Sequence, residues 1–143
     1  MSSPSLRAPS ATAPPLRRRL RKALILCGAL SADASAWIEE SGADVAIHPL
    51  PPLLHNRPER IAPEVERLVL ELRERYDEIA IGYADCGTHG ALDEVCDRHG
   101  VRRLPGRHCY DIYAGEREMT AIWEAEPGTY VLTDFLVLSF DRV

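Results

Sequence analysis

The chain has 143 residues, which suits one domain with a single hydrophobic core. Hydrophobic residues make up 45% and charged residues 27%, as in ordinary globular proteins, and the sequence has no run of about 20 apolar residues that would span a membrane. Residues 1–22 carry six basic side chains and no acidic one, while the rest of the chain has 11 basic and 22 acidic side chains, a net charge of −11. This acidic body argues against a nucleic-acid-binding surface on the folded part.

Residues 1–22 predict a disordered basic tail, because residues 1–16 are rich in Ser, Pro and Ala and show no apolar period. The basic stretch 17–22, the apolar residues 23–30 and the small residues after them also resemble a secretory signal peptide. The apolar part is short, however, and contains Cys27, so a first buried strand is the better interpretation. Because four cysteines are too few for a disulfide scaffold, we expect a cytoplasmic protein with reduced thiols.

Residues 23–143 predict a single domain in which strands alternate with helices. The predicted strands are 23–27, 44–48, 78–83, 101–104 and 130–132, and the predicted helices are 32–41, 63–75, 91–98, 116–125 and 134–140. Four prolines exclude a helix or a central strand over residues 49–58. We expect Ser31 to cap the first helix and Gly42 to end it. This alternation predicts a Rossmann-like α/β fold, with a mostly parallel sheet and helices on both faces.

Three cysteines follow predicted strands: Cys27, Cys86 and Cys109. The carboxyl ends of parallel strands meet at one edge of the sheet, which is where open α/β sheets bind ligands. His55 lies on the proline-rich loop and His108 precedes Cys109, so an imidazole is expected nearby. Three thiolates with one imidazole favour Zn²⁺ or an iron or iron–sulfur centre over Mg²⁺ or Ca²⁺. We therefore predict a metal site of the three cysteines, with His55 or His108 as the fourth ligand.

The turn over residues 83–90 connects a predicted strand to a predicted helix and contains two glycines. Free N–H groups at a helix start bind anions, so Gly87, Thr88 and His89 are candidate cofactor-binding residues. The turn matches neither the dinucleotide-binding fingerprint nor a phosphate-binding loop. A cysteine at a helix N-terminus has a depressed pKa, which favours Cys86 as a thiolate, whether for metal binding or for nucleophilic attack.

Other interpretations of these residues remain open. In a cysteine-nucleophile enzyme, Cys86 would attack, His108 or His55 would act as base, and the amides after Cys86 would stabilise an oxyanion. A non-catalytic accessory protein of a metalloenzyme is a third class. Cys96, inside the predicted helix 91–98, is expected to pack in the core, and a cysteine that ends a strand is often only a small hydrophobic residue.

Five ordered motifs resemble the family catalogued as domain of unknown function 1638. They are CGAL at 27–30, LHNRPERI at 54–61, YADCGT at 83–88, HCYD at 108–111 and EPGTYVLTDFL at 126–136. The resemblance covers residues 23–142, and its motifs include all five predicted metal ligands. Some relatives place the last histidine one residue earlier than His108.

The resemblance implies little about activity, because the family has no established one. Some members resemble companions of corrinoid-dependent methyl-transfer systems, which implies a metal or corrinoid cofactor and a protein partner. Similar proteins continue for several tens of residues past 134–136, so the resemblance also implies that this chain is a shortened member or lacks a C-terminal extension.

Overall fold

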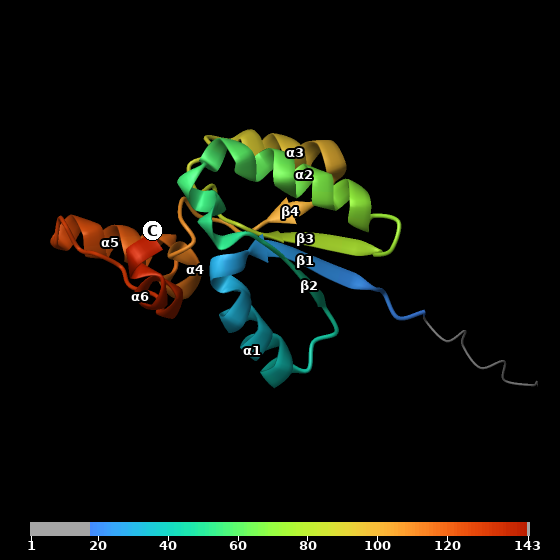
Figure 1. Ribbon diagram of the computed structural model, residues 1–143, viewed down its shortest axis with the longest axis horizontal. Helices are drawn as coiled ribbons and strands as arrows, with labels where there is room; N and C mark the ends of the chain where they lie inside the picture. The colour runs from blue at the N-terminus through green and yellow to red at the C-terminus, as the bar shows by residue number, and fades with distance from the viewer. Residues whose placement is uncertain (1–17, 143) are drawn as a thin grey trace, which may run out of the picture.

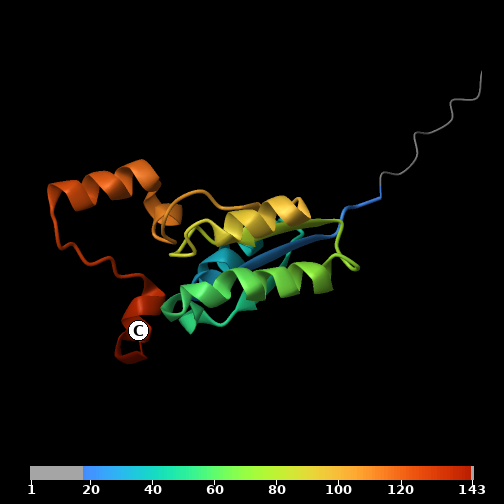
Figure 2. The same ribbon diagram turned by 90° about the horizontal axis from the view of Figure 1, so that it is seen from above.

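The computed structural model describes residues 18–142, so the disorder predicted for residues 1–16 lies outside the described residues. Strands β1 (Lys22–Cys27), β2 (Ala46–Leu50), β3 (Glu78–Gly82) and β4 (Arg102–Arg103) form a parallel sheet in the order β2-β1-β3-β4. Helix α1 (Ser31–Ser41) covers one face, and α2 (Ile61–Leu72) and α3 (Ala91–His99) cover the other (Figures 1 and 2). This arrangement confirms the predicted Rossmann-like α/β fold.

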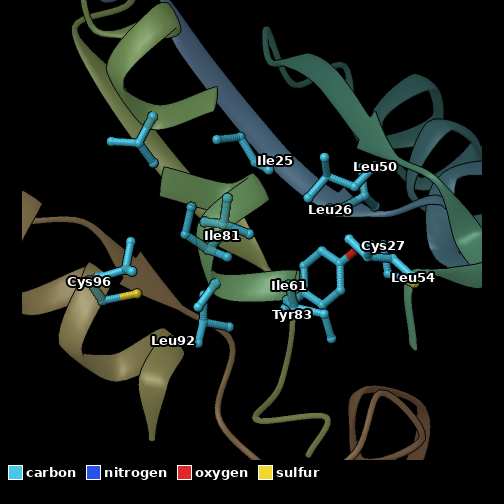
Figure 3. Close-up of a cluster of buried hydrophobic side chains, with 14 of the residues drawn as sticks. Ile25, Leu26, Cys27, Leu50, Leu54, Ile61, Ile81, Tyr83, Leu92 and Cys96 are labelled. Atoms are coloured by element: carbon cyan, nitrogen blue, oxygen red, sulfur yellow. The ribbon is translucent and has the colours of Figure 1, made fainter. Parts of the chain in front are cut away.

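The hydrophobic core lies between the sheet and helices α2 and α3. Ile25 of β1 and Ile81 of β3 are completely buried in this core (Figure 3). They belong to one cluster with Val65 and Leu72 of α2. Apolar residues three and four positions apart give α2 this buried stripe. Cys96 of α3 belongs to the same cluster and is 6% exposed, which confirms its expected packing role.

Two predictions about strands were wrong: the end of the second strand and the presence of a strand at residues 130–132. Strand β2 continues through Pro49 to Leu50, beyond the predicted limit, because β2 is an edge strand and one of its sides needs no N–H donor. After it, the loop forms two short 3₁₀ turns, η2 (Pro52–Asn56) and η3 (Pro58–Arg60). Residues 130–132 form no strand, and Tyr130 and Leu132 are more than half exposed, so their apolar character does not reflect burial in the sheet.

The described part of the basic segment, residues 18–22, is ordered rather than a disordered tail. Lys22 begins β1, and the backbone N–H of Arg21 donates to the Asp77 carboxylate at 2.8 Å. The Arg18 side chain pairs with the same carboxylate, and these contacts hold the pKa of Asp77 below its usual range. The apolar stretch that resembles a signal peptide is the central strand β1 followed by the 3₁₀ turn η1 (Gly28–Leu30).

The C-terminal segment lies beyond the carboxyl ends of the strands (Figure 1). It contains α4 (Asp111–Ala114), α5 (Glu116–Ala125), α6 (Asp134–Leu138) and the 3₁₀ turn η4 (Phe140–Arg142). The Tyr113 hydroxyl donates to Asp33 of α1 at 2.6 Å, which links this segment to the body of the fold. Among residues 18–142, no helix has the length and apolar character needed to cross a membrane.

Candidate thiol site at the sheet edge

The strand order creates a crevice between β1 and β3. These strands are neighbours, but the helices that follow them, α1 and α3, lie on opposite faces of the sheet (Figure 1). At such a switch point the two connections diverge and leave a gap beyond the strand ends, which is where open α/β sheets bind ligands. Cys27 is the last residue of β1, and Tyr83 directly follows β3. The fold therefore places both residues at the position expected of a ligand site.

A cavity of about 250 Å³ opens at this point. Thiols, imidazoles and apolar side chains line it: Cys27, Ala29, Leu30, His55, Tyr83, Cys86, Gly87, His108, Cys109, Tyr110, Thr133, Phe135 and Leu136. All five predicted metal ligands are in this set, although they come from four separate stretches of the chain. Thr88 and His89 are not. The α6 residues Phe135 and Leu136 form part of its wall, so the C-terminal segment helps to enclose it.

Cys86 and Cys109 are two interacting thiols on the wall of this cavity. The Cys109 thiol and the backbone amides of Cys109 and Ala84 lower the pKa of Cys86, outweighing burial and the nearby charge of Asp85. The same contact, together with burial, raises the pKa of Cys109, which makes Cys86 the member of the pair that ionises first. Cys86 also has a φ of 49°, in the left-handed region that non-glycine residues seldom adopt.

The predicted cause of the Cys86 pKa was wrong, although its direction was right. Helix α3 begins at Ala91, five residues after Cys86, so the helix N-terminus does not act on the thiol directly. The lowering comes first from the Cys109 thiol, which follows β4 rather than β3. Cys109, which is distant from Cys86 in the sequence, therefore lowers the Cys86 pKa in place of the helix N-terminus.

Cys27 lies deeper than the other two thiols. It is 3% exposed, and burial raises its pKa, although the Ala29 amide and the Tyr83 hydroxyl lower it in part. Cys86, Cys109 and Tyr83 line the same cavity as Cys27. Figure 3 shows the Tyr83 ring in the core with its hydroxyl directed at Cys27.

The two histidines differ in their suitability as ligands. The His55 Nδ1 contacts the Pro52 carbonyl oxygen at 2.7 Å, and because a carbonyl only accepts, Nδ1 carries the proton. In the neutral ring, Nε2 is then the nitrogen whose lone pair can bind a ligand. His108 is exposed and packs edge-on against Trp123, with ring centroids 5.7 Å apart. The geometry thus favours His55 as the donor.

The sequence analysis predicted that the N–H groups of the turn over residues 83–90 bind an anion or a cofactor. In the structure, the Asp85 carboxylate binds these donors instead. It accepts hydrogen bonds from the Thr88 hydroxyl and the backbone N–H groups of His89 and Gly90, at 2.9 to 3.2 Å. The Thr88 N–H donates to the Asp85 carbonyl at 3.0 Å. A protein carboxylate therefore occupies the place proposed for a ligand. The Thr88 amide is likewise already bonded, which weakens the predicted oxyanion site.

Asp111 performs a similar role on the other loop. Its buried carboxylate accepts hydrogen bonds from the backbone N–H groups of Arg107 at 2.7 Å and His108 at 3.0 Å. A Cβ on Gly106 would lie 2.8 Å from the Asp111 Cβ, so this close approach requires glycine. The Cys86 N–H also donates to the Arg107 carbonyl at 2.8 Å, which joins the two loops. The positions of Cys86 and Cys109 are therefore fixed by two aspartates that the sequence analysis did not single out.

The Asp85 interactions predict a specific pH dependence of stability. Burial opposes its ionisation, but the donors of Gly90, Thr88, His89 and Gly87 together hold its pKa below the usual range. A carboxyl group with a lowered folded-state pKa stabilises the protein above its unfolded pKa of about 3.9, and this stabilisation is lost as the pH falls through the folded value. We expect Asp85→Asn to lower the free energy of unfolding by about 1–3 kcal/mol at pH 7.

The measurement is urea unfolding of wild type and Asp85→Asn between pH 7 and pH 3. The difference between the two proteins should shrink at the acid end, where the wild-type carboxylate also becomes protonated. Glu94→Gln, on the exposed side of α3, is the control and should unfold like wild type. A difference that stays constant down to pH 3 would show that the Asp85 charge contributes nothing.

Within residues 18–142, no three His, Cys, Asp or Glu side chains are already arranged around a common point as metal ligands. What the structure shows is a Rossmann-like domain with three thiols, an accessible imidazole and one buried hydroxyl around a small cavity at the switch point.

Residues 49–143 match the family described as "Protein of unknown function (DUF1638)", and the chain belongs to this family. The matched range includes His55, Cys86, His108 and Cys109, whereas Cys27 precedes it. No curated protein matches the chain.

Proposed function

We propose that this protein binds a thiophilic metal ion, Zn²⁺ or iron, through Cys27, Cys86 and Cys109. The observation that carries the proposal is that three thiols from separate segments line one cavity at the switch point of the sheet. Thiolates and imidazole are the donors that Zn²⁺ and iron–sulfur centres take in proteins. The pKa of Cys86 is lowered and that of Cys109 is raised, so Cys86 is the thiol that would bind a metal ion first, and the metal would then displace the Cys109 proton.

We propose His55 as the fourth ligand, with His108 as the alternative. The bond from Nδ1 to the Pro52 carbonyl fixes the ring and leaves Nε2 for the metal, an arrangement common among metal-binding histidines. His108 would have to leave its contact with Trp123. Replacing His55 with Ala should therefore weaken metal binding more than replacing His108 with Ala.

The cavity is better suited to a metal ion or a small molecule than to a corrinoid. Its volume of about 250 Å³ lies below the range of roughly 300–1,000 Å³ that is typical of sites for drug-sized ligands. A corrinoid is larger than such ligands, so the proposed cofactor is the metal. A link to methyl-transfer metabolism would then consist of an accessory role beside a partner metalloenzyme.

A cysteine nucleophile is the second candidate, and the state of Cys86 favours it. Its lowered pKa, its unusual backbone angle and its place on the cavity wall are all features of reactive cysteines. The group that activates it is the Cys109 thiol rather than the His108 or His55 base suggested by the sequence. In this function Cys86 would attack an electrophilic carbon or sulfur of a small substrate in the cavity.

Elemental analysis separates the two candidates. The full chain, without a His-tag, should be purified anaerobically so that its thiols stay reduced, as we propose they are in the cytoplasm. The metal function predicts zinc or iron at close to one equivalent, or more iron for a cluster. Protein that contains no metal and takes up none when Zn²⁺ or Fe²⁺ is added would favour the nucleophile.

A further inference from the structure

One buried polar group at the site has no ordinary partner. Tyr83 is 1% exposed, and within residues 18–142 its hydroxyl has no hydrogen-bond partner. Buried tyrosine hydroxyls usually find a partner, because an unpaired one loses its hydrogen bond to water. Phenylalanine would fill the same space in the core without this cost. An unpaired hydroxyl at a cavity wall therefore indicates a function.

The hydroxyl is directed at Cys27, whose sulfur lies within its electrostatic influence and is a candidate acceptor (Figure 3). A neutral thiol is a weak acceptor, whereas a thiolate accepts strong hydrogen bonds. The Ala29 amide is directed at the same sulfur. Two donors from different segments thus meet on a cysteine that is almost completely buried, which suits a sulfur that carries negative charge when a metal is bound.

We propose that Tyr83 is a positioning residue that donates an O–H···S hydrogen bond to the Cys27 sulfur and holds it in place as a metal ligand. This role rests on the proposed metal function. Hydrogen bonds to metal ligands from outside the coordination shell orient the ligand and commonly change metal affinity 10- to 100-fold. Tyr83 also directly follows β3, so the bond connects the two strands that form the switch point.

The test is a Co²⁺ titration of the full chain, monitored by the thiolate-to-cobalt charge-transfer band. We expect Tyr83→Phe to bind Co²⁺ about tenfold more weakly or worse. Its band should move to longer wavelength, because a sulfur that loses a hydrogen bond gives up an electron more readily. The melting temperature of the metal-free variant should equal or exceed that of wild type, because the Tyr83 hydroxyl has no hydrogen-bond partner to lose among the described residues. In a Cys27→Ala background, Tyr83→Phe should have no further effect on the band.

Tyr76→Phe is the matched control. The Tyr76 hydroxyl is 3.1 Å from the His48 Nε2, and neither residue lines the cavity, so this variant should bind Co²⁺ like wild type. Tyr83→Phe with unchanged affinity and band position would overturn the positioning role alone. A lower melting temperature with an unchanged band would also overturn it, in favour of a structural role. A wild-type protein without any thiolate band would overturn the metal function and this role together.

Discussion

Replacing Cys86 with Ala is expected to abolish stoichiometric metal binding and to remove the stabilisation that the metal provides. Cys86 is the thiol whose pKa is lowered, so it is the first to bind a metal ion at neutral pH. A ligand that binds only the folded state raises stability by about 4 kcal/mol at a free concentration 1,000 times its dissociation constant. The metal content and the melting temperature with and without added Zn²⁺ should be measured for wild type and for Cys27→Ala, Cys86→Ala and Cys109→Ala.

Cys96→Ala is the control for these variants. Cys96 is a buried cysteine like Cys27, but it lies in α3 among core residues and does not line the cavity. It should keep the metal and the Zn²⁺-dependent rise in melting temperature, even if its own packing change lowers both melting temperatures equally. If Cys96→Ala lost the Zn²⁺ effect as completely as Cys86→Ala, cysteine burial rather than a site would explain the losses.

In the metal-free protein, Cys86 should be the first cysteine to react with iodoacetamide as the pH is raised from 5. Thiol alkylation requires the thiolate, and hydrogen bonds from Cys109 hold the pKa of Cys86 below its usual value. Removing the Cys109 thiol raises that pKa, so Cys109→Ala should shift the alkylation profile to higher pH. At pH 6 to 7 a shift of one pH unit corresponds to about tenfold slower alkylation.

Peptide mass analysis after short exposures would identify the reacting cysteine. Cys96→Ala should leave the profile unchanged, since Cys96 is separated from the pair. First labelling at Cys109, or an identical profile for Cys109→Ala, would contradict the influence of Cys109 on the Cys86 pKa. This result bears on both candidate functions, because the metal ligand and the nucleophile use the same thiolate.

The sequence was sufficient to predict the position of the thiols but not the way in which they are held. Each of Cys27 and Cys86 ends or closely follows an apolar run, and parallel strands bring such ends together, so their convergence follows from periodicity and connection rules. The contact between Cys86 and Cys109 depends on loop conformations that no periodic pattern encodes. For the same reason, the sequence analysis did not identify Asp85 and Asp111, whose carboxylates hold the two loops.

Other errors have identifiable physical causes. Pro49 is compatible with a strand only because β2 lies at the sheet edge, and strand order is a property of the whole fold. The apolar residues around Leu132 suggested a strand, but among the described residues they form no strand pairing. A possible signal for Tyr83 was present, since a tyrosine that directly follows a buried strand places its hydroxyl near the ligand edge.

X-ray absorption at the zinc edge of the Zn²⁺-loaded full chain tests the metal site most directly. The proposed site predicts three sulfur ligands at about 2.3 Å and one nitrogen at about 2.0–2.1 Å. Cys27→Ala should reduce the sulfur number by one, while Cys96→Ala should leave it at three. A zinc shell made only of nitrogen and oxygen, or a sulfur number unchanged in Cys27→Ala, Cys86→Ala and Cys109→Ala, would contradict a metal centre built from these three thiols.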